Sequence, residues 1–194
     1  MHLHSNASLV KSSRNNLRLV ESTSPGGAVA RPSGRASDST SEWIYWREQA
    51  LRHIRDQLPT SIRPAEQSIR ISNPYGIERD HSLLVEIFVW EQNFEEAWDE
   101  AISGGCENHL WLRLADAISK DHADRAYLVY KELVPLALNQ TNNDAYSEAI
   151  ELLTKMRKLT TRLGNKAEHA DYLTALRVEY KRKRNFIQML ERLR

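Results

Sequence analysis

One residue of this chain, Cys106, has the side chain best suited to covalent catalysis, because a thiolate is a strong nucleophile. It lies just before an expected helix start, and His109 follows soon after it, so a thiol-dependent enzyme is one alternative function. The sequence provides no third group that would orient this pair. A packed, unreactive thiol is therefore the simpler interpretation, and we predict no catalytic residue and no cofactor.

Carboxylates form a second group of candidate residues, in the segment FEEAWDEA. On a helix they fall into pairs spaced i,i+4, so that four of them could bind a cation. Acids in the first turns of a helix also interact favourably with its dipole and stay hydrated, which favours a solvated face over a metal site. Residues 86–107 contain seven acids and no Lys or Arg. The acidic partner surface predicted here consists of Glu91, Glu95, Glu96, Asp99 and Glu100.

Basic residues dominate the end of the sequence. Residues 177–194 hold seven bases against two acids, including four consecutive cations at 181–184. Placed at the last turn of a helix, such cations stabilise its C-terminus by about 0.3–1 kcal/mol each, which requires no ligand. The alternative is a weak, sequence-tolerant contact with nucleic-acid phosphates or with an acidic partner. The residues predicted for that contact are Arg177, Lys181, Arg182, Lys183 and Arg184.

Composition limits the remaining function classes. The 194 residues are 41% hydrophobic and 27% charged with a formal net charge of +1, which indicates a globular protein without a global field that attracts DNA or anionic membranes. A single cysteine cannot form an internal disulfide or a multi-cysteine zinc module, so a reducing, cytoplasmic location is expected and no metal site is predicted. The longest apolar stretch, SLLVEIFVW, is too short to span a bilayer, and no membrane association is predicted.

The residue pattern divides the chain into a tail and a helical domain. Residues 1–41 contain no Phe, Trp or Tyr and are rich in Ser, Gly, Asn and Pro. They cannot bury enough apolar surface to offset the entropy of ordering, so we predict a disordered tail. Residues 42–194 have apolar residues at helical spacing, interrupted by a proline-containing connector at about 59–79. The five tryptophans fall within these helical stripes and are interpreted as core and inter-helix packing.

Polar caps and glycine stops delimit the helices of this domain. A first helix ends at Pro59, and later helices begin at polar residues such as Asn93 and Asn165. Pro135 should kink its helix, because it removes the hydrogen bond to the carbonyl of Lys131. Short loops between amphipathic helices predict an all-α fold of antiparallel hairpins, in a TPR-like α-solenoid or a compact helical array. The helices predicted after the connector are 81–91, 94–103, 107–119, 122–139, 143–163, 166–183 and 186–193.

Several ordered blocks give the chain a family resemblance over roughly residues 43–193: LVEIFVWEQNFEEAW, GGCENHLWLRLA, QTNNDAYSEAIELLTKMRKL and EYKRKRNF. It resembles the C-terminal helical region of bacterial SWIM zinc finger family proteins, which implies a helical scaffold module. In that family a C-x-C-x(n)-C-x-H zinc motif lies upstream and is proposed to mediate DNA or protein binding. This chain has Cys106 as its single cysteine and lacks the motif, so no zinc ligand is carried over.

These features together predict a non-enzymatic helical scaffold that mediates protein–protein interaction. An acidic surface and a basic end on one chain can pair with a protein partner, with a second copy of the chain, or with phosphate. We therefore expect a protein partner, with a homo-oligomer as one form of it. A weak nucleic-acid-binding accessory module at the basic end is the alternative.

Overall fold

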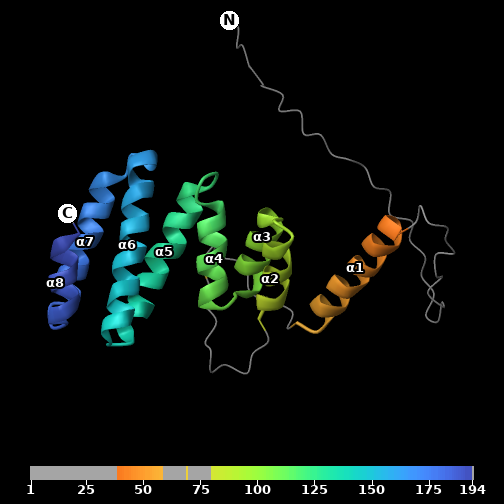
Figure 1. Ribbon diagram of the computed structural model, residues 1–194, viewed down its shortest axis with the longest axis horizontal. Helices are drawn as coiled ribbons and strands as arrows, with labels where there is room; N and C mark the ends of the chain where they lie inside the picture. Colours follow the sequence, from red (N-terminus) through yellow and green to blue (C-terminus); the bar gives the residue numbers. More distant parts are fainter. Residues whose placement is uncertain (1–38, 59–68, 70–79, 194) are drawn as a thin grey trace, which may run out of the picture. The chain divides into compact units, whose positions relative to one another are not determined.

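α-Helices make up all the regular secondary structure in the computed structural model, which describes residues 39–58, 69 and 80–193 (Figure 1). No strand occurs within these ranges, so the predicted all-α fold class is confirmed. The helices are α1 (Ser39–Asp56), α2 (Ser82–Trp90), α3 (Phe94–Gly104), α4 (Asn108–Ile118), α5 (Ala123–Asn139), α6 (Asn143–Leu163), α7 (Lys166–Glu179) and α8 (Arg184–Arg192).

Each helix predicted after the connector has a counterpart, because the apolar spacing that marks it in the sequence also forms its buried face. The largest difference concerns the predicted helix 166–183, which ends at Glu179, while α8 begins earlier than predicted, at Arg184. The predicted disordered tail falls outside the described residues, except for its last three positions. The predicted connector also lies outside them, apart from Ile69.

From α2 to α7, helices that follow one another in the sequence also lie side by side in the structure (Figure 1). Thus α2 packs on α3, α3 on α4, α4 on α5, α5 on α6, and α6 on both α7 and α8. The described residues from Trp43 onward belong to one compact unit. Such packing between neighbours is what short loops between amphipathic helices produce.

The core runs through these helix pairs and combines large side chains with alanines. Trp111 of α4 and Tyr130 of α5 are almost fully buried, and the alanines Ala97, Ala126 and Ala149 have no exposed surface. Small residues at these positions let neighbouring helices approach closely, so that large side chains fill the space between them at the density of a crystal. Each large apolar side chain buried in this way contributes about 1.5–3 kcal/mol relative to exposure.

A proline inside α5 leaves a backbone carbonyl free to accept a hydrogen bond from α7. Pro135 has no N–H, so the carbonyl of Lys131 loses its partner within the helix, as the sequence predicts. The hydroxyl of Tyr172 on α7 donates a hydrogen bond to that carbonyl over 3.1 Å. Helix α5 continues unbroken to Asn139, and its missing hydrogen bond is replaced by a contact between helices.

Two of the asparagines expected to cap helices stand at helix starts without capping them. Asn93 and Asn165 occupy N-cap positions, but neither side chain makes a capping hydrogen bond. Asn142 does cap α6, since its side-chain oxygen accepts from the N–H of Ala145 at 2.8 Å. Gly164 ends α6 with a φ of 74°, a left-handed conformation that glycine adopts without strain.

Candidate interaction surfaces

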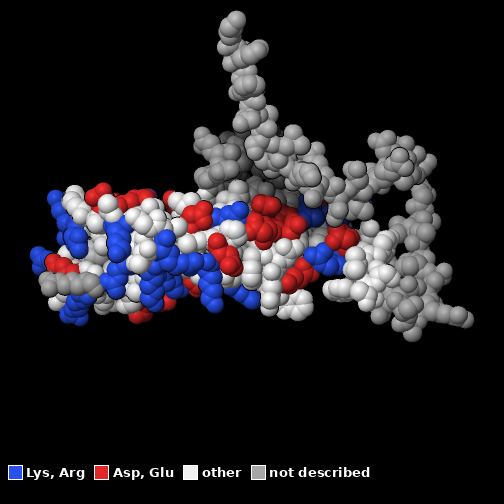
Figure 2. All heavy atoms as spheres, turned by 90° about the horizontal axis from the view of Figure 1, so that it is seen from above, with Lys and Arg blue, Asp and Glu red and all other residues white. Residues whose placement is uncertain are grey.

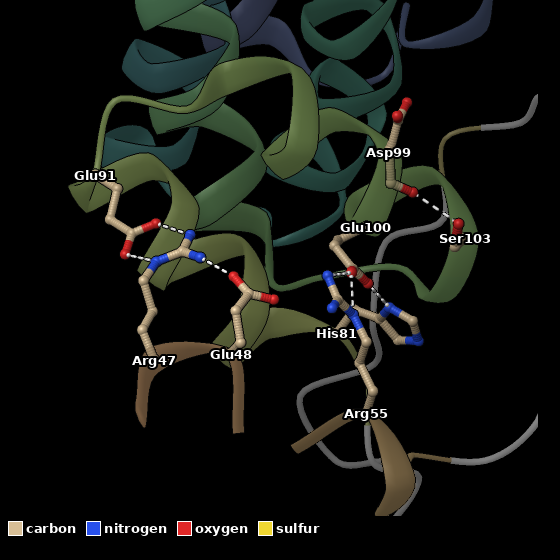
Figure 3. Close-up of polar contacts among 8 residues, drawn as sticks. All are labelled: Arg47, Glu48, Arg55, His81, Glu91, Asp99, Glu100 and Ser103. Carbon is tan, nitrogen blue, oxygen red and sulfur yellow. Dashed lines mark hydrogen bonds and ion pairs between the residues drawn. The ribbon is translucent and has the colours of Figure 1, made fainter. Parts of the chain in front are cut away.

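Helix α1 is attached to the helices after it mainly through two arginines (Figure 3). Leu51 is the one buried side chain that the structure describes in α1, so apolar burial holds this helix only weakly. Arg47 makes a bidentate ion pair with Glu91, in which Nε lies 2.6 Å from one carboxylate oxygen and Nη2 lies 2.5 Å from the other. Arg55 binds Oε1 of Glu100 through two nitrogens, at 2.8 and 2.7 Å.

The ring of Phe88 faces both arginines. The guanidinium carbons of Arg47 and Arg55 lie 5.7 and 5.9 Å from its centroid, within the range of a cation–π interaction. Nδ1 of His81 lies 2.7 Å from the second oxygen of Glu100. Burial alone would raise the pKa of the Glu100 carboxyl, but hydrogen bonds from His81 and Arg55 outweigh it and lower that pKa. The carboxylate therefore stays ionised at neutral pH and contacts both Arg55 and His81.

A glycine makes room for the His81 ring. A Cβ atom at Gly104 would lie 1.7 Å from Cδ2 of His81, far closer than non-bonded atoms approach. The φ angle of Gly104 is not positive. The end of α3 therefore requires glycine at this position for space, and not for an unusual backbone conformation.

Much of the predicted acidic partner surface is neutralised within the chain. Glu91 and Glu100 hold α1, as described above. Glu95 binds Arg125 at 2.9 Å and lies 2.8 Å from Nε2 of His122. Figure 2 shows acidic side chains gathered over the region of α3, but three of the five predicted residues already have cationic partners.

The acids left for a partner lie on one side of α3. Glu96 and Asp99 are exposed and make no ion pair with other residues of the described ranges. Asp99 also lines a groove of about 890 Å³ between α3 and α5, together with Asp124 and Glu132. The unpaired part of the acidic surface thus extends from α3 towards α5, which the sequence pattern of residues 86–107 does not indicate.

An apolar groove lies between α1 and α2. Its volume is about 630 Å³, within the usual range for ligand-binding pockets. Its charged lining residues are Arg47, Glu86, Glu91 and Arg113. Its apolar lining residues are Trp43, Trp46, Ala50, Leu51, Ile87 and Trp90.

Three tryptophans of this groove are exposed, which corrects the interpretation of all five as core and inter-helix packing. The exposed fraction is 61% for Trp43, 46% for Trp46 and 73% for Trp90. Trp111 is fully buried and Trp98 is half-buried, and their rings meet edge to face with centroids 5.7 Å apart. Helical spacing of aromatic residues shows that a stripe exists, but not whether another element covers it.

The exposed tryptophans lie on the two helices that carry most of the exposed large apolar side chains. Seven large apolar side chains are exposed within the described residues, and five of them lie on α1 and α2. Besides the three tryptophans these are Ile44 and Leu83. The other two, Leu128 and Val178, lie on different helices, α5 and α7. Single exposed apolar side chains are ordinary on a protein surface, whereas a cluster usually has a binding role.

The predicted basic surface lies around the turn between α7 and α8. No ion pair joins any of its five residues to the rest of the described chain. Figure 2 shows Lys and Arg side chains gathered over the region of α6–α8. The exposed members are Arg177, Lys181, Arg182 and Arg184, and Lys183 is half-buried.

The position of residues 181–184 in this turn changes their expected electrostatics. Lys181 and Arg182 follow the end of α7, where a cation interacts favourably with the helix dipole. Lys183 and Arg184 stand at the start of α8, where the dipole disfavours a cation. Nζ of Lys183 lies 5.7 and 5.9 Å from the centroids of two tyrosine rings, which offsets part of that penalty. Stabilisation of a helix C-terminus therefore does not account for all four cations at 181–184.

No family model, curated protein or solved structure matches this chain. The resemblance to SWIM zinc finger family proteins stays a prediction. Of the helices described above, none is long and apolar enough to cross a membrane. Within the same residues, no three His, Cys, Asp or Glu side chains come together as a metal site would need.

Cys106 lies in the core with no exposed surface. Burial, reinforced by the carboxylates of Asp80 and Glu107, raises the pKa of its thiol far above the usual range. Nδ1 of His109 lies 3.1 Å from the carboxylate of Glu107. A reactive thiolate has to be accessible and of low pKa, so this geometry does not support the thiol-dependent alternative.

Proposed function

We propose that this protein is a non-enzymatic helical scaffold that binds a protein partner in the groove between α1 and α2. The observation that carries this proposal is the exposure of Trp43, Trp46 and Trp90 along that groove. A tryptophan buries at most about 150–250 Å², so at these exposed fractions the three indoles leave roughly 270–450 Å² in water. An apolar patch of that size on two adjacent helices is typical of a binding surface.

The groove is held in shape before a partner binds. Arg47 forms ion pairs with Glu91 and with Glu48, whose Oε1 lies 2.6 Å from Nη1 of Arg47. Arg55 of the same helix forms another ion pair, with Glu100. Binding therefore need not order α1, which lowers the entropic cost of association. Tryptophan and arginine are also the residues that most often dominate the affinity of protein interfaces.

The packing of successive helices from α2 to α7 supports the scaffold role. In helical arrays such as the TPR-like α-solenoid expected from the sequence, each added helix pair extends the binding surface. Partners of such arrays bind along faces and edges, and the α1–α2 groove offers a site of that kind.

The test compares Trp90→Ala with a matched control, Val178→Ala. The two side chains are 73% and 68% exposed, so both variants should keep the wild-type melting temperature within about 2 °C. Partners captured from the native host are then quantified for the three proteins. We expect Trp90→Ala to reduce capture of a specific partner by at least about tenfold, while Val178→Ala retains it. If Trp90→Ala retains every partner of the wild type, the groove is not a binding site.

A second candidate function, weak nucleic-acid binding, is favoured by the basic surface around the α7–α8 turn. Its cations have no ion pair with the described acids, and two of them occupy a helix start that disfavours positive charge. Such a surface contacts phosphates and not base edges. The expected dissociation constant is about 10⁻⁴–10⁻⁶ M at physiological salt, with a steep dependence on salt.

Replacing residues 181–184 together by Gln tests this candidate. Wild type and variant are titrated with labelled DNA and RNA at about 50 and about 200 mM salt. The wild type should bind at low salt and weaken as salt rises, and the variant should not bind. A control with Arg52, Lys120 and Lys158 changed to Gln removes exposed cations elsewhere and should bind like the wild type. Wild-type protein without salt-dependent binding of either nucleic acid rules this candidate out.

A further inference from the structure

We infer that the α1–α2 groove is closed by the same groove of a second copy of this chain, which gives a dimer with two-fold symmetry. The inference rests on the proposed function, because it names the partner that occupies the same groove. In a two-fold interface, residue i of one copy meets residue j of the other, and j meets i. The surface must therefore be complementary to itself, both in apolar area and in charge.

The apolar area of this face matches what a dimer needs. A standard interface buries about 800 Å² per partner, and homodimer interfaces are about 65% apolar, so each copy has to supply roughly 500 Å² of apolar surface. The three exposed indoles supply roughly 270–450 Å² of it. Ile44 and Leu83, which are 54% and 53% exposed on the same helices, add to this area. No other two neighbouring helices in the described ranges expose a comparable group of large apolar side chains.

Two charged residues make the groove complementary to itself. Glu86 of α2 and Arg113 of α4 both line it and are exposed, and neither makes an ion pair with another described residue. The other charged lining residues, Arg47 and Glu91, are already bound to each other. A two-fold axis through the groove sets Glu86 of one copy opposite Arg113 of the other, and forms this pair twice. A partner of a single charge sign would leave one of the two residues unpaired.

The tryptophans fit the same arrangement. Trp43 and Trp46 belong to α1, which forms one wall of the groove, and Trp90 is the last residue of α2, which forms the other wall. Pairing the groove with its own copy sets the α1 wall against the α2 wall. Trp90 of one copy then packs against Trp43 and Trp46 of the other, and aromatic rings pair favourably in edge-to-face or offset geometry. Anchoring residues of an interface commonly meet one another in this way.

The oligomeric state of the full chain, measured by sedimentation velocity and light scattering over a range of concentrations, tests the inference. The wild type should be a dimer that dissociates on dilution. Trp90→Ala should be a folded monomer whose melting temperature matches that of the wild type at dilutions where the wild-type dimer has dissociated. Val178→Ala should dimerise like the wild type. A wild type that stays monomeric at every concentration overturns the inference.

Charge exchange tests the two-fold pairing itself. Glu86→Arg and Arg113→Glu each set like charges opposite one another, and each should weaken the dimer by about tenfold or more. Both changes in one chain restore opposite charges and should recover the dimer. A mixture of the two single variants should form a heterodimer, because each arginine then faces a glutamate. If folded single variants dimerise like the wild type, the pairing across the two-fold axis is wrong.

The same variants separate this inference from the proposed function. A monomeric wild type that captures another protein through Trp90 would keep the groove as a binding site and overturn the second copy as its occupant. A dimer that survives Trp90→Ala and both charge changes uses a different surface and also overturns the inference. A wild type that neither dimerises nor loses any partner through Trp90→Ala overturns the inference and the proposed function together.

Discussion

Helices α1–α3 and helices α7–α8 distribute their polar and apolar side chains in opposite ways. In α1–α3 most of the acids predicted as a surface are paired with cations of the same chain, and the large apolar side chains left exposed include three indoles. In α7–α8 the apolar residues Leu176, Phe186 and Leu190 are buried, and the cations have no ion pair with described residues. Helices α1–α3 are therefore suited to bind a partner with an apolar surface, and helices α7–α8 are suited to bind an anion.

The comparison shows that the charge of a segment does not determine the charge of the surface it forms. Residues 86–107 contain seven acids and no base. The cations that neutralise two of these acids come from α1, 44 and 45 positions earlier in the chain. What a charged segment presents to a partner depends on which distant segment docks on it.

Gly104→Ala should have the largest effect on stability, and it should disturb helices α1–α3 and not α7–α8. The new Cβ would lie 1.7 Å from the His81 ring, so the ring has to move and its contact with Glu100 is lost. We expect thermal unfolding to show a loss of about 2–3 kcal/mol, as in overpacked cores. The matched control is Gly164→Ala, where space is open but φ is positive, and backbone strain should remove about 1 kcal/mol. A loss at Gly104 no larger than at Gly164 would contradict the steric role of His81.

Glu100→Gln should weaken the attachment of α1 in a way that depends on pH. It removes the charge that Arg55 and His81 both contact, and should lower stability by about 1–2 kcal/mol at neutral pH. The pKa of Glu100 is lowered on folding, so its carboxylate stabilises the protein above the unfolded value of about 4.3. That stability is lost as pH falls through the lower folded pKa.

Denaturant unfolding of the wild type and of Glu100→Gln at about pH 7 and about pH 3 measures this contribution. Other carboxyls titrate equally in both proteins, so the difference between them isolates Glu100. The difference should shrink in acid, and a constant difference would show that the charge is not what holds α1.

In α7–α8, stability should depend on pH over a different range, because a buried histidine titrates there. His169 of α7 is 4% exposed, and neither ring nitrogen has a hydrogen-bond partner among the described residues. Burial, and after it the charge of Arg157, lowers its pKa. As pH falls below the pKa of about 6.5 that histidine has in the unfolded chain, the unfolded chain binds a proton that the folded chain does not. Stability therefore decreases with falling pH until the pH reaches the lowered pKa of the folded protein.

His169→Phe should abolish this loss while changing stability by less than about 1 kcal/mol at pH 7.5, since it replaces an unpaired polar ring by an apolar one. Urea unfolding at several values between about pH 7.5 and pH 5 measures the slope for both proteins. If the variant loses stability as steeply as the wild type, the titrating group lies elsewhere.

The smallest effect on stability is expected from replacing residues 181–184 by Gln. Favourable charges after α7 and unfavourable charges at the start of α8 should largely cancel, which leaves a change of about 0.5 kcal/mol or less. The melting temperature at low and moderate salt measures it. A clear loss that disappears at high salt would restore the interpretation of this run as a helix cap.

Helix positions could be predicted from the sequence because they depend on local signals. Apolar spacing and the stop at Gly164 act within a few residues, and α6 spans the predicted positions, 143–163. The capping mechanism was not predictable to the same degree, because a capping bond depends on the side-chain rotamer. Asn142 makes such a bond, whereas Asn93 and Asn165 do not.

The groove could not be predicted, because it is a property of two helices that are distant in the sequence. Trp43 on α1 and Trp90 on α2 each belong to an apolar stripe of the kind that usually lies in a core. Whether a stripe is covered depends on the direction in which its helix docks, and here ion pairs of Arg47 and Arg55 determine the docking of α1. Such long-range pairs leave no pattern in the sequence around either partner.

Helix α7 has a particular relation to α5 because of the proline in α5. The buried side chains described within α7 are His169 and Leu176, fewer than in α5 or α6, so it should be among the first helices to open in native-state hydrogen exchange. Its Tyr172 hydroxyl donates to the Lys131 carbonyl, which Pro135 deprives of a helical donor. Local opening of α7 thus also removes a hydrogen bond from the middle of α5, and this hydroxyl couples the two helices in addition to the ion pair between Lys131 and Glu168.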